Sequence, residues 1–101
     1  MLTSLTYELL KHPDVLLKLR AEIDEVLGDQ PIALNDISKM PYTSAVLRET
    51  LRFHPPAPIR YVHCFEPTTI GNGKYTLNPD DHVLINTIST HRDPAVWGDN
   101  V

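Results

Sequence analysis

The chain has 101 residues, of which 42% are hydrophobic and 22% charged, a composition typical of one small globular domain rather than a disordered chain. Thirteen acidic against nine basic residues give a net charge of −4, and no basic cluster is present, so a nucleic-acid partner is not indicated. A domain this short buries only about 60–65% of its unfolded surface, so a core of its own would be marginal.

Two helices are expected at the start of the chain. The leucines of residues 2–10 keep helical spacing as far as His12, and Pro13 ends that helix because its ring cannot continue the hydrogen bonding. Pro13 then opens an amphipathic helix that runs to Leu27, where Gly28 suits the C-terminal cap. No long apolar run is present, so neither a transmembrane span nor a signal peptide is visible.

A short helical turn follows, with Asn35 as its expected cap, before Pro41 opens a third helix. Glu49 lies on one arc of that helix together with Tyr42, Ala45, Val46 and Phe53. We therefore expect Glu49 to face packing rather than water, and Arg52, three residues on, to pair with it. The pattern alone leaves two interpretations open, an exposed ion pair worth about 0–1 kcal/mol or a buried pair that supports a site.

The second half of the chain changes to short β-like runs at residues 59–65, 68–70, 74–77 and 82–87, so the fold class is predicted as mainly α with a small β region (α+β). The stretch from Gly71 to Gly73 can close a hairpin between the second and third runs, and residues 78–81 form a turn before the fourth. The single cysteine, Cys64, is interpreted as a small strand residue, and the histidines lack paired zinc-ligand spacings, so no metal site is expected.

The end of the third helix carries a resemblance to a known family. "ETLRFHPPAP" is similar to the Glu-x-x-Arg helix of the cytochrome P-450 haem-thiolate monooxygenases, and "HRDPAVWGDN" resembles the segment of that family shortly before the haem-binding loop. "KHPDVLLKLRAEIDEVLG" and "MPYTSAVLRETLR" resemble two further segments in the family's order, so the resemblance covers essentially the whole chain. It implies that residues 1–101 are part of the cytochrome P-450 fold and not a complete domain, from the end of the oxygen-binding helix to the segment before the haem-binding loop.

The resemblance also implies roles for particular residues. Glu49 and Arg52 match the structural Glu-x-x-Arg pair, which fixes the core beside the haem and takes no direct part in bond making. Ala57, Pro58 and Ile59 match the strand entrance that lines the substrate pocket, where small and apolar residues leave room for a hydrophobic substrate.

The family's catalytic group is not expected within this chain. The haem-ligand cysteine is expected beyond Val101, and Cys64 is not that ligand, so no catalytic residue and no metal ligand are assigned here. Haem-contact residues are left unassigned. His91 and Arg92 match a further segment of the family, with an implied role in packing and hydrogen bonding.

The implied parent enzyme uses haem, dioxygen and electrons from a flavin reductase or another electron donor to hydroxylate an apolar small molecule. Within the family the chain is most similar to the soluble fatty-acid hydroxylases fused to their reductase, which implies FAD, FMN and NADPH and a cytoplasmic location; other members are membrane-anchored through an N-terminal segment. The chain alone is expected to be inactive. Two alternatives stay open: a short helical interaction module, and a catalytically dead relative that keeps the scaffold.

Overall fold

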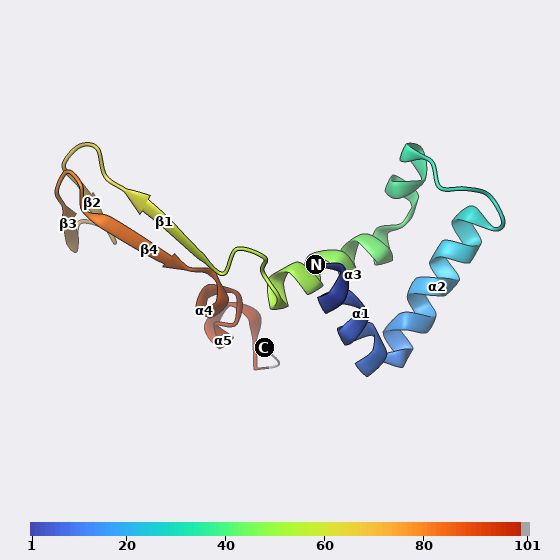
Figure 1. Cartoon of the computed structure of the whole chain (residues 1–101). Coiled ribbons are helices and arrows are strands. Elements are labelled where there is room, and N and C mark those ends of the chain that lie inside the picture. Colours follow the sequence, from blue (N-terminus) through green and yellow to red (C-terminus); the bar gives the residue numbers. More distant parts are fainter. Residues whose placement is uncertain (100–101) are drawn as a thin grey trace. The chain divides into compact units, whose positions relative to one another are not determined.

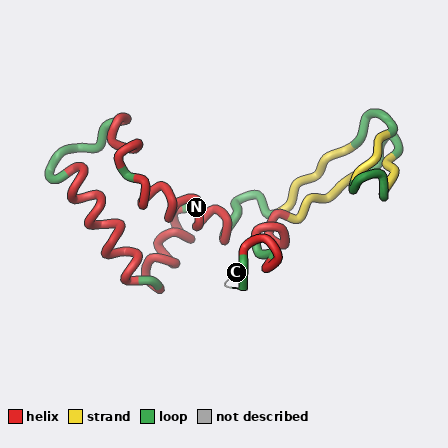
Figure 2. Tube along the Cα trace, turned by 180° about the vertical axis from the view of Figure 1, so that it is seen from behind, coloured by secondary structure: helices red, strands yellow, loops and turns green. Residues whose placement is uncertain are grey.

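The computed structural model describes residues 1–99 and divides the chain into two compact units, the first covering Met1–Pro56 and the second beginning at Ala57 (Figure 1). The first unit is helical, and the second combines strands with two short helices (Figure 2). The expected fold class, mainly α with a small β region, is confirmed. Asn100, the last residue of the "HRDPAVWGDN" segment, and Val101 lie outside the described residues.

Four helices make up the first unit. α1 spans Leu2–Lys11 and α2 spans Pro13–Leu27; a 3₁₀ helix, η1, spans Leu34–Lys39, and α3 spans Pro41–Phe53. α2 and α3 both begin with the proline predicted for their first position, where the missing N–H has no intrahelical partner to lose. The predicted helices are therefore confirmed.

The start of η1 differs from the expectation. The helix begins at Leu34, one residue before Asn35, so the prediction of Asn35 as its cap is wrong. Ala33 occupies the cap position, and the carboxylate of Asp36, the third residue of the helix, accepts the backbone N–H of Ala33 at 3.0 Å and the ammonium group of Lys39 at 3.0 Å. A negative charge near the N-terminus of a helix is favoured by the backbone dipole.

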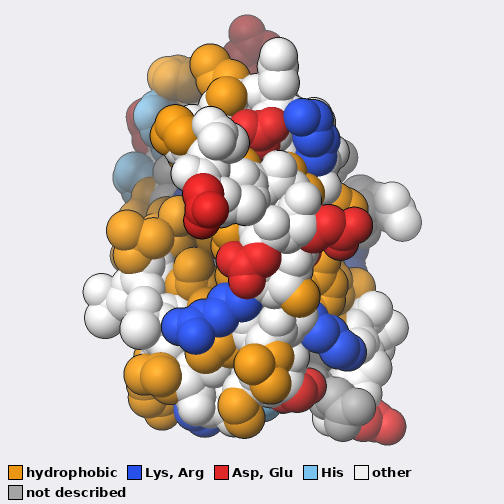
Figure 3. Space-filling model, turned by 90° about the vertical axis from the view of Figure 1, so that its right-hand side faces the viewer, with side chains coloured by type: hydrophobic (Ala, Val, Ile, Leu, Met, Phe, Trp, Pro, Cys, Tyr) orange, Lys and Arg blue, Asp and Glu red, His pale blue; other side chains and the backbone are white. Residues whose placement is uncertain are grey.

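The core of this unit is small, as expected for so short a chain. Met40, 5% exposed, is the one hydrophobic residue among the described residues that is buried, and Thr50 and Arg52 are the buried polar residues, at 6% and 9%. Large apolar side chains stay exposed, and Figure 3 shows hydrophobic side chains interspersed with acidic and basic ones on one face of the molecule. Among the described residues, no helix combines the length and the apolar character needed to cross a membrane.

The second unit contains two antiparallel strand pairs. β1, Ile59–His63, pairs with β4, His82–Asn86. β2, Thr68–Ile70, pairs with β3, Tyr75–Leu77. All four predicted runs are confirmed as strands. Their pairing places the β2–β3 hairpin within the connection between β1 and β4.

The predicted hairpin turn is confirmed by its backbone. Gly71, Asn72 and Gly73 all adopt positive φ, at 62°, 54° and 84°, between the paired strands β2 and β3. Glycine enters this region without steric cost, and asparagine tolerates it better than most residues. Asp80 also has a positive φ of 70°, within the turn expected before β4.

Two short helices that the sequence pattern did not predict follow β4. α4 spans Thr87–His91, and α5 spans Pro94–Trp97. A side chain caps each of them: Asn86 accepts from Ser89 N at 3.3 Å, and Asp93 accepts from Ala95 N at 2.9 Å. The indole N–H of Trp97 donates to the Thr90 carbonyl at 3.1 Å, and the His91 ring lies edge-on to the Trp97 ring at 6.5 Å between centroids.

Candidate functional site

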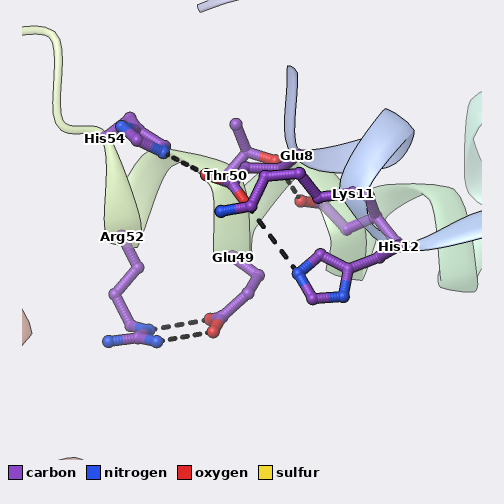
Figure 4. A network of polar contacts seen from close by, with 8 residues as sticks. Glu8, Lys11, His12, Glu49, Thr50, Arg52 and His54 are labelled. Carbon is purple, nitrogen blue, oxygen red and sulfur yellow. Dashed lines mark hydrogen bonds and ion pairs between the residues drawn. The ribbon is translucent and has the colours of Figure 1, made fainter. Parts of the chain in front are cut away.

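Glu49 and Arg52 meet on α3 as the sequence predicted. The Arg52 guanidinium donates through Nε to Glu49 Oε2 at 2.8 Å and through Nη2 to Glu49 Oε1 at 2.6 Å. Figure 4 shows the two side chains reaching one another along one side of the helix. The arrangement is a bidentate, charge-assisted pair, the strongest form that an arginine and a carboxylate can make.

The electrostatics of the pair hold both groups in their charged forms. The hydrogen bond from Arg52 lowers the pKa of Glu49, against an opposing contribution from burial, and the attraction of the guanidinium adds to the lowering. The hydrogen bond to Glu49 likewise raises the pKa of Arg52. Both groups therefore stay ionised through neutral pH, and neither is suited to donate or accept a proton there.

The two partners differ strongly in exposure. The side chain of Arg52 is 9% exposed, whereas that of Glu49 is 62% exposed. The expectation that Glu49 faces packing is therefore wrong for this chain. The physical reason is that its arc of α3 is only partly covered, since Ala45 is itself exposed and Val46 is only half-buried.

A second contact, which sequence reasoning missed, lies at the end of α3. His54, the residue that follows the helix, places Nε2 at 2.8 Å from Glu8 Oε1 of α1 (Figure 4). Lys11 and His12 also lie near this carboxylate, at 3.6 and 3.9 Å from Oε2. The hydrogen bond with His54 is the main reason that the pKa of Glu8 is lowered, burial opposes it, and Lys11 adds to the lowering.

A third contact, also missed, lies at the start of α3. Glu22 of α2 accepts hydrogen bonds from Tyr42 N at 2.8 Å, from Thr43 N at 2.6 Å and from Thr43 Oγ1 at 2.7 Å. One sequence signal could have suggested it: Met40, just before the helix, has no side-chain acceptor for these amides. The sequence contains no sign of which distant residue would supply one.

The predicted pocket residues lie where the second unit begins. Ala57 and Pro58 are exposed, and Ile59, 47% exposed, opens β1 and pairs with Asn86. The Pro58 carbonyl accepts the backbone N–H of Thr87 at 2.9 Å, which ties the segment to the end of β4. Because these residues and the Glu49–Arg52 pair belong to different units, the pocket assignment stays a prediction.

Comparison with known proteins decides the family. The cytochrome P-450 family model matches residues 2–100. The chain belongs to the cytochrome P-450 family. It is 52% identical over 100 residues to a self-sufficient cytochrome P-450 monooxygenase of Phanerodontia chrysosporium, a match that covers 99% of this chain and 10% of that protein. Carnosic acid synthase of Salvia pomifera is 45% identical over 91 residues, covering 89% of this chain and 18% of that enzyme.

The fold agrees with that of a solved cytochrome P-450. A zebra fish cytochrome P-450 in a structure with progesterone matches with a TM-score of 0.88 and 33% identity, over 95% of this chain and 23% of that chain. A bifunctional cytochrome P-450/NADPH–P-450 reductase of Acremonium egyptiacum is 42% identical over 105 residues, covering 99% of this chain and 10% of that protein. The chain thus spans about a tenth of the length of the fusion relatives, and the resemblance to the fused type is confirmed.

Haem is the cofactor of the cytochrome P-450 family, and none of the residues described here is assigned as a ligand of its iron. The Cys64 thiol donates to the Glu66 carbonyl at 2.7 Å, and no cluster of three or more metal-ligating side chains occurs among residues 1–99. The exposed apolar segment from Ala57 to Ile59 stays the predicted lining of the substrate pocket, and haem-contact residues stay unassigned.

Proposed function

We propose that this chain is a structural and pocket-lining segment of a haem-thiolate monooxygenase that hydroxylates an apolar organic substrate with dioxygen and electrons from a flavin reductase. The fusion relatives support the electron supply, and with it FAD, FMN and NADPH as further cofactors. The short apolar segment at the start of β1 supports an apolar substrate. No catalytic group is assigned among residues 1–99, and we expect the isolated chain to be inactive.

The observation that carries the proposal is the Glu49–Arg52 pair. Arg52 is a nearly buried cation whose planar fork is matched by one carboxylate on the same helix. Since both groups stay charged at neutral pH, the pair supports the fold beside the haem and does not exchange protons with a substrate. The remaining exposure of Glu49 gives it room for further donors from elements of the complete domain.

In the bound state, haem held by a thiolate supplies the chemistry of oxygen activation. The residues of this chain position the substrate and exclude water. Ala57, Pro58 and Ile59 present apolar side chains that orient an apolar substrate and offer no side-chain hydrogen bond to water. Along the chain, His54 to Pro56 connect the end of α3 to that segment.

The test uses the haem-loaded protein that carries this chain, with Arg52→Lys and Glu49→Gln. A solvent-exposed pair is worth about 0–1 kcal/mol, whereas the loss of one partner of a buried pair costs about 3–5 kcal/mol. We expect the larger value, seen as a severe loss of haem content and of the thiolate-type carbon monoxide spectrum, because lysine cannot reproduce the guanidinium fork.

The matched control is Arg48→Lys, an exposed arginine on the same helix, which should leave haem content unchanged. Normal haem content in both pair variants, with only turnover lost, would contradict the structural role and point to a catalytic one. Normal haem content together with normal turnover would show that the pair has neither a structural nor a catalytic role.

A further inference from the structure

We propose that Glu22 is a positioning residue that fixes the start of α3 and, through the helix, the Glu49–Arg52 pair. The inference rests on the proposed function of that pair. It assigns a task to a residue of α2 that belongs to neither the pair nor the pocket segment.

The first turn of α3 needs an acceptor from outside the helix. The first backbone bond of the helix runs from Ser44 N to the Met40 carbonyl, so the N–H groups of Tyr42 and Thr43 have no partner within it. Pro41 has no N–H, and Met40 caps nothing with its side chain. The cap position is therefore occupied by a methionine instead of the serine, threonine, aspartate or asparagine that usually serves the orphan amides.

Glu22 satisfies these groups completely. Each carboxylate oxygen takes one backbone N–H, Oε1 from Tyr42 and Oε2 from Thr43, and the Thr43 hydroxyl adds a third bond. The negative charge lies at the helix end where the backbone dipole favours an anion. An amide in its place has one acceptor oxygen and turns an NH₂ group towards a donor, so it cannot replace the carboxylate.

The charge state supports the same role. Burial acts to raise the pKa of Glu22, but the hydrogen bonds from Thr43 and Tyr42 more than offset it, so the pKa lies below its ordinary value. The group is therefore ionised at neutral pH.

Fixing the first turn of α3 also positions Glu49 and Arg52, because α3 is one continuous helix from Pro41 to Phe53. At about 1.5 Å per residue, Glu49 lies about 9 Å along the axis from Thr43. A helix transmits a rotation of its first turn to every side chain beyond it. At the opposite end His54 contacts Glu8, so carboxylates from α2 and α1 hold the two ends of the helix that carries the pair.

The test is hydrogen–deuterium exchange resolved to single amides, in the haem-loaded protein that carries this chain. In Glu22→Gln the amides of Tyr42 and Thr43 should exchange about fivefold faster or more, and haem content should fall. Glu25→Gln, an exposed glutamate on the same helix, is the matched control and should change neither. After correction for intrinsic rates, wild-type protection of these two amides should fall as pH drops through the lowered pKa of Glu22, and Glu22→Gln should show no such titration.

Unchanged exchange at Tyr42 and Thr43 in Glu22→Gln would overturn the inference. Faster exchange with normal haem content would also overturn it, because the first turn would then not govern the pair; the proposed function would stand if Arg52→Lys still lost haem. If Glu22→Gln does not fold, Thr43→Val and Thr43→Ser replace it. Thr43→Val removes the hydroxyl that donates to Glu22 and should speed the exchange of the Tyr42 and Thr43 amides. Thr43→Ser keeps that hydroxyl and should leave their exchange unchanged. Equal exchange rates in the two variants would reject the contact between Thr43 and Glu22.

Discussion

Each of the two units of this chain is stabilised internally by a different kind of contact. In the helical unit, side chains reach across long stretches of sequence: Glu22 holds the start of α3, and Glu8 contacts the residue that follows it. In the strand unit, backbone ladders join β1 to β4 and β2 to β3, and most strand side chains stay exposed. The helical unit therefore depends on a few particular side chains, whereas the strand unit depends on backbone conformation and keeps its side chains available for contacts elsewhere.

This difference predicts where substitutions are costly. A side-chain deletion should matter most in the helical unit, at the residues that join its helices. A backbone change should matter most in the strand unit, at its turns. Changes to exposed strand side chains should alter what the segment contacts and leave stability nearly unchanged. The following predictions all concern the haem-loaded protein that carries the chain.

The largest effect is expected at Met40, the buried apolar residue between η1 and α3. Met40→Ala removes most of that side chain from a packed site and should lower the free energy of unfolding by about 2–5 kcal/mol. Leu34→Ala is the control, because Leu34 is 87% exposed and its loss should stay within about 0.5 kcal/mol. Denaturant unfolding measures both, and equal costs would show that the helical unit has no core of its own.

A smaller loss is expected from the hairpin turn of the strand unit. Gly71→Ala and Gly73→Ala each force a side chain into positive φ, at a cost of about 1–2 kcal/mol. An added Cβ at Gly71 would lie 3.2 Å from Tyr75 Cδ2, whereas one at Gly73 would have no atom within 4 Å, so Gly71→Ala should cost slightly more. Asn72→Gly keeps the conformation and serves as the control. Thermal midpoints decide the order, and a neutral Gly73→Ala would show that the turn does not require positive φ.

The sequence predicted those features of each unit that depend on local backbone preferences. The starts of α2 and α3 and the β2–β3 hairpin were predictable because Pro13, Pro41 and the stretch from Gly71 to Gly73 restrict or permit backbone angles locally. The strands themselves were predictable from local composition. α4 and α5 were not, because helices of five and four residues are too short to show a periodic pattern.

The candidate site was predictable in part. The Glu49–Arg52 contact followed from their spacing on one helix, which is a local property. The exposure of Glu49 and the contacts of Glu22 and Glu8 depend on which elements pack together, and no local pattern contains that information. The pairing of β1 with β4 was missed for the same reason, since the strands are joined through a separate hairpin.

A pH-dependent effect is expected at the contact between Glu8 and His54. The pKa of Glu8 is lowered in the folded chain, so this contact contributes stability above the ordinary glutamate pKa and loses it as pH falls through the lowered value. Lys11 and His12 face the same carboxylate and share in the loss. The thermal midpoint of wild type should therefore exceed that of Glu8→Gln at pH 7, and the gap should close as the pH falls through the lowered pKa of Glu8. A gap that persists in acid would assign the stabilisation to packing instead of charge.

The smallest effect on stability, and the sharpest test of the strand unit, is expected at Ala57 and Ile59. Both are exposed within their unit, so Ala57→Phe and Ile59→Ala should change the free energy of unfolding by no more than about 0.5 kcal/mol. If the segment lines the substrate pocket, however, an added ring excludes some substrate poses and a lost side chain admits others.

Productive geometry is sensitive to displacements of about 1 Å, so the ratio of oxidation products on one apolar substrate should shift while haem content stays constant. Ala95→Phe, the same change at an exposed residue of α5, is the matched control and should leave the ratio unchanged. Unchanged ratios in both Ala57→Phe and Ile59→Ala would remove this segment from the pocket. A shifted product ratio at constant haem content would instead assign different roles to the two units. The helical unit would determine whether haem is bound, and the segment from Ala57 to Ile59 would determine which substrate carbon reaches the haem.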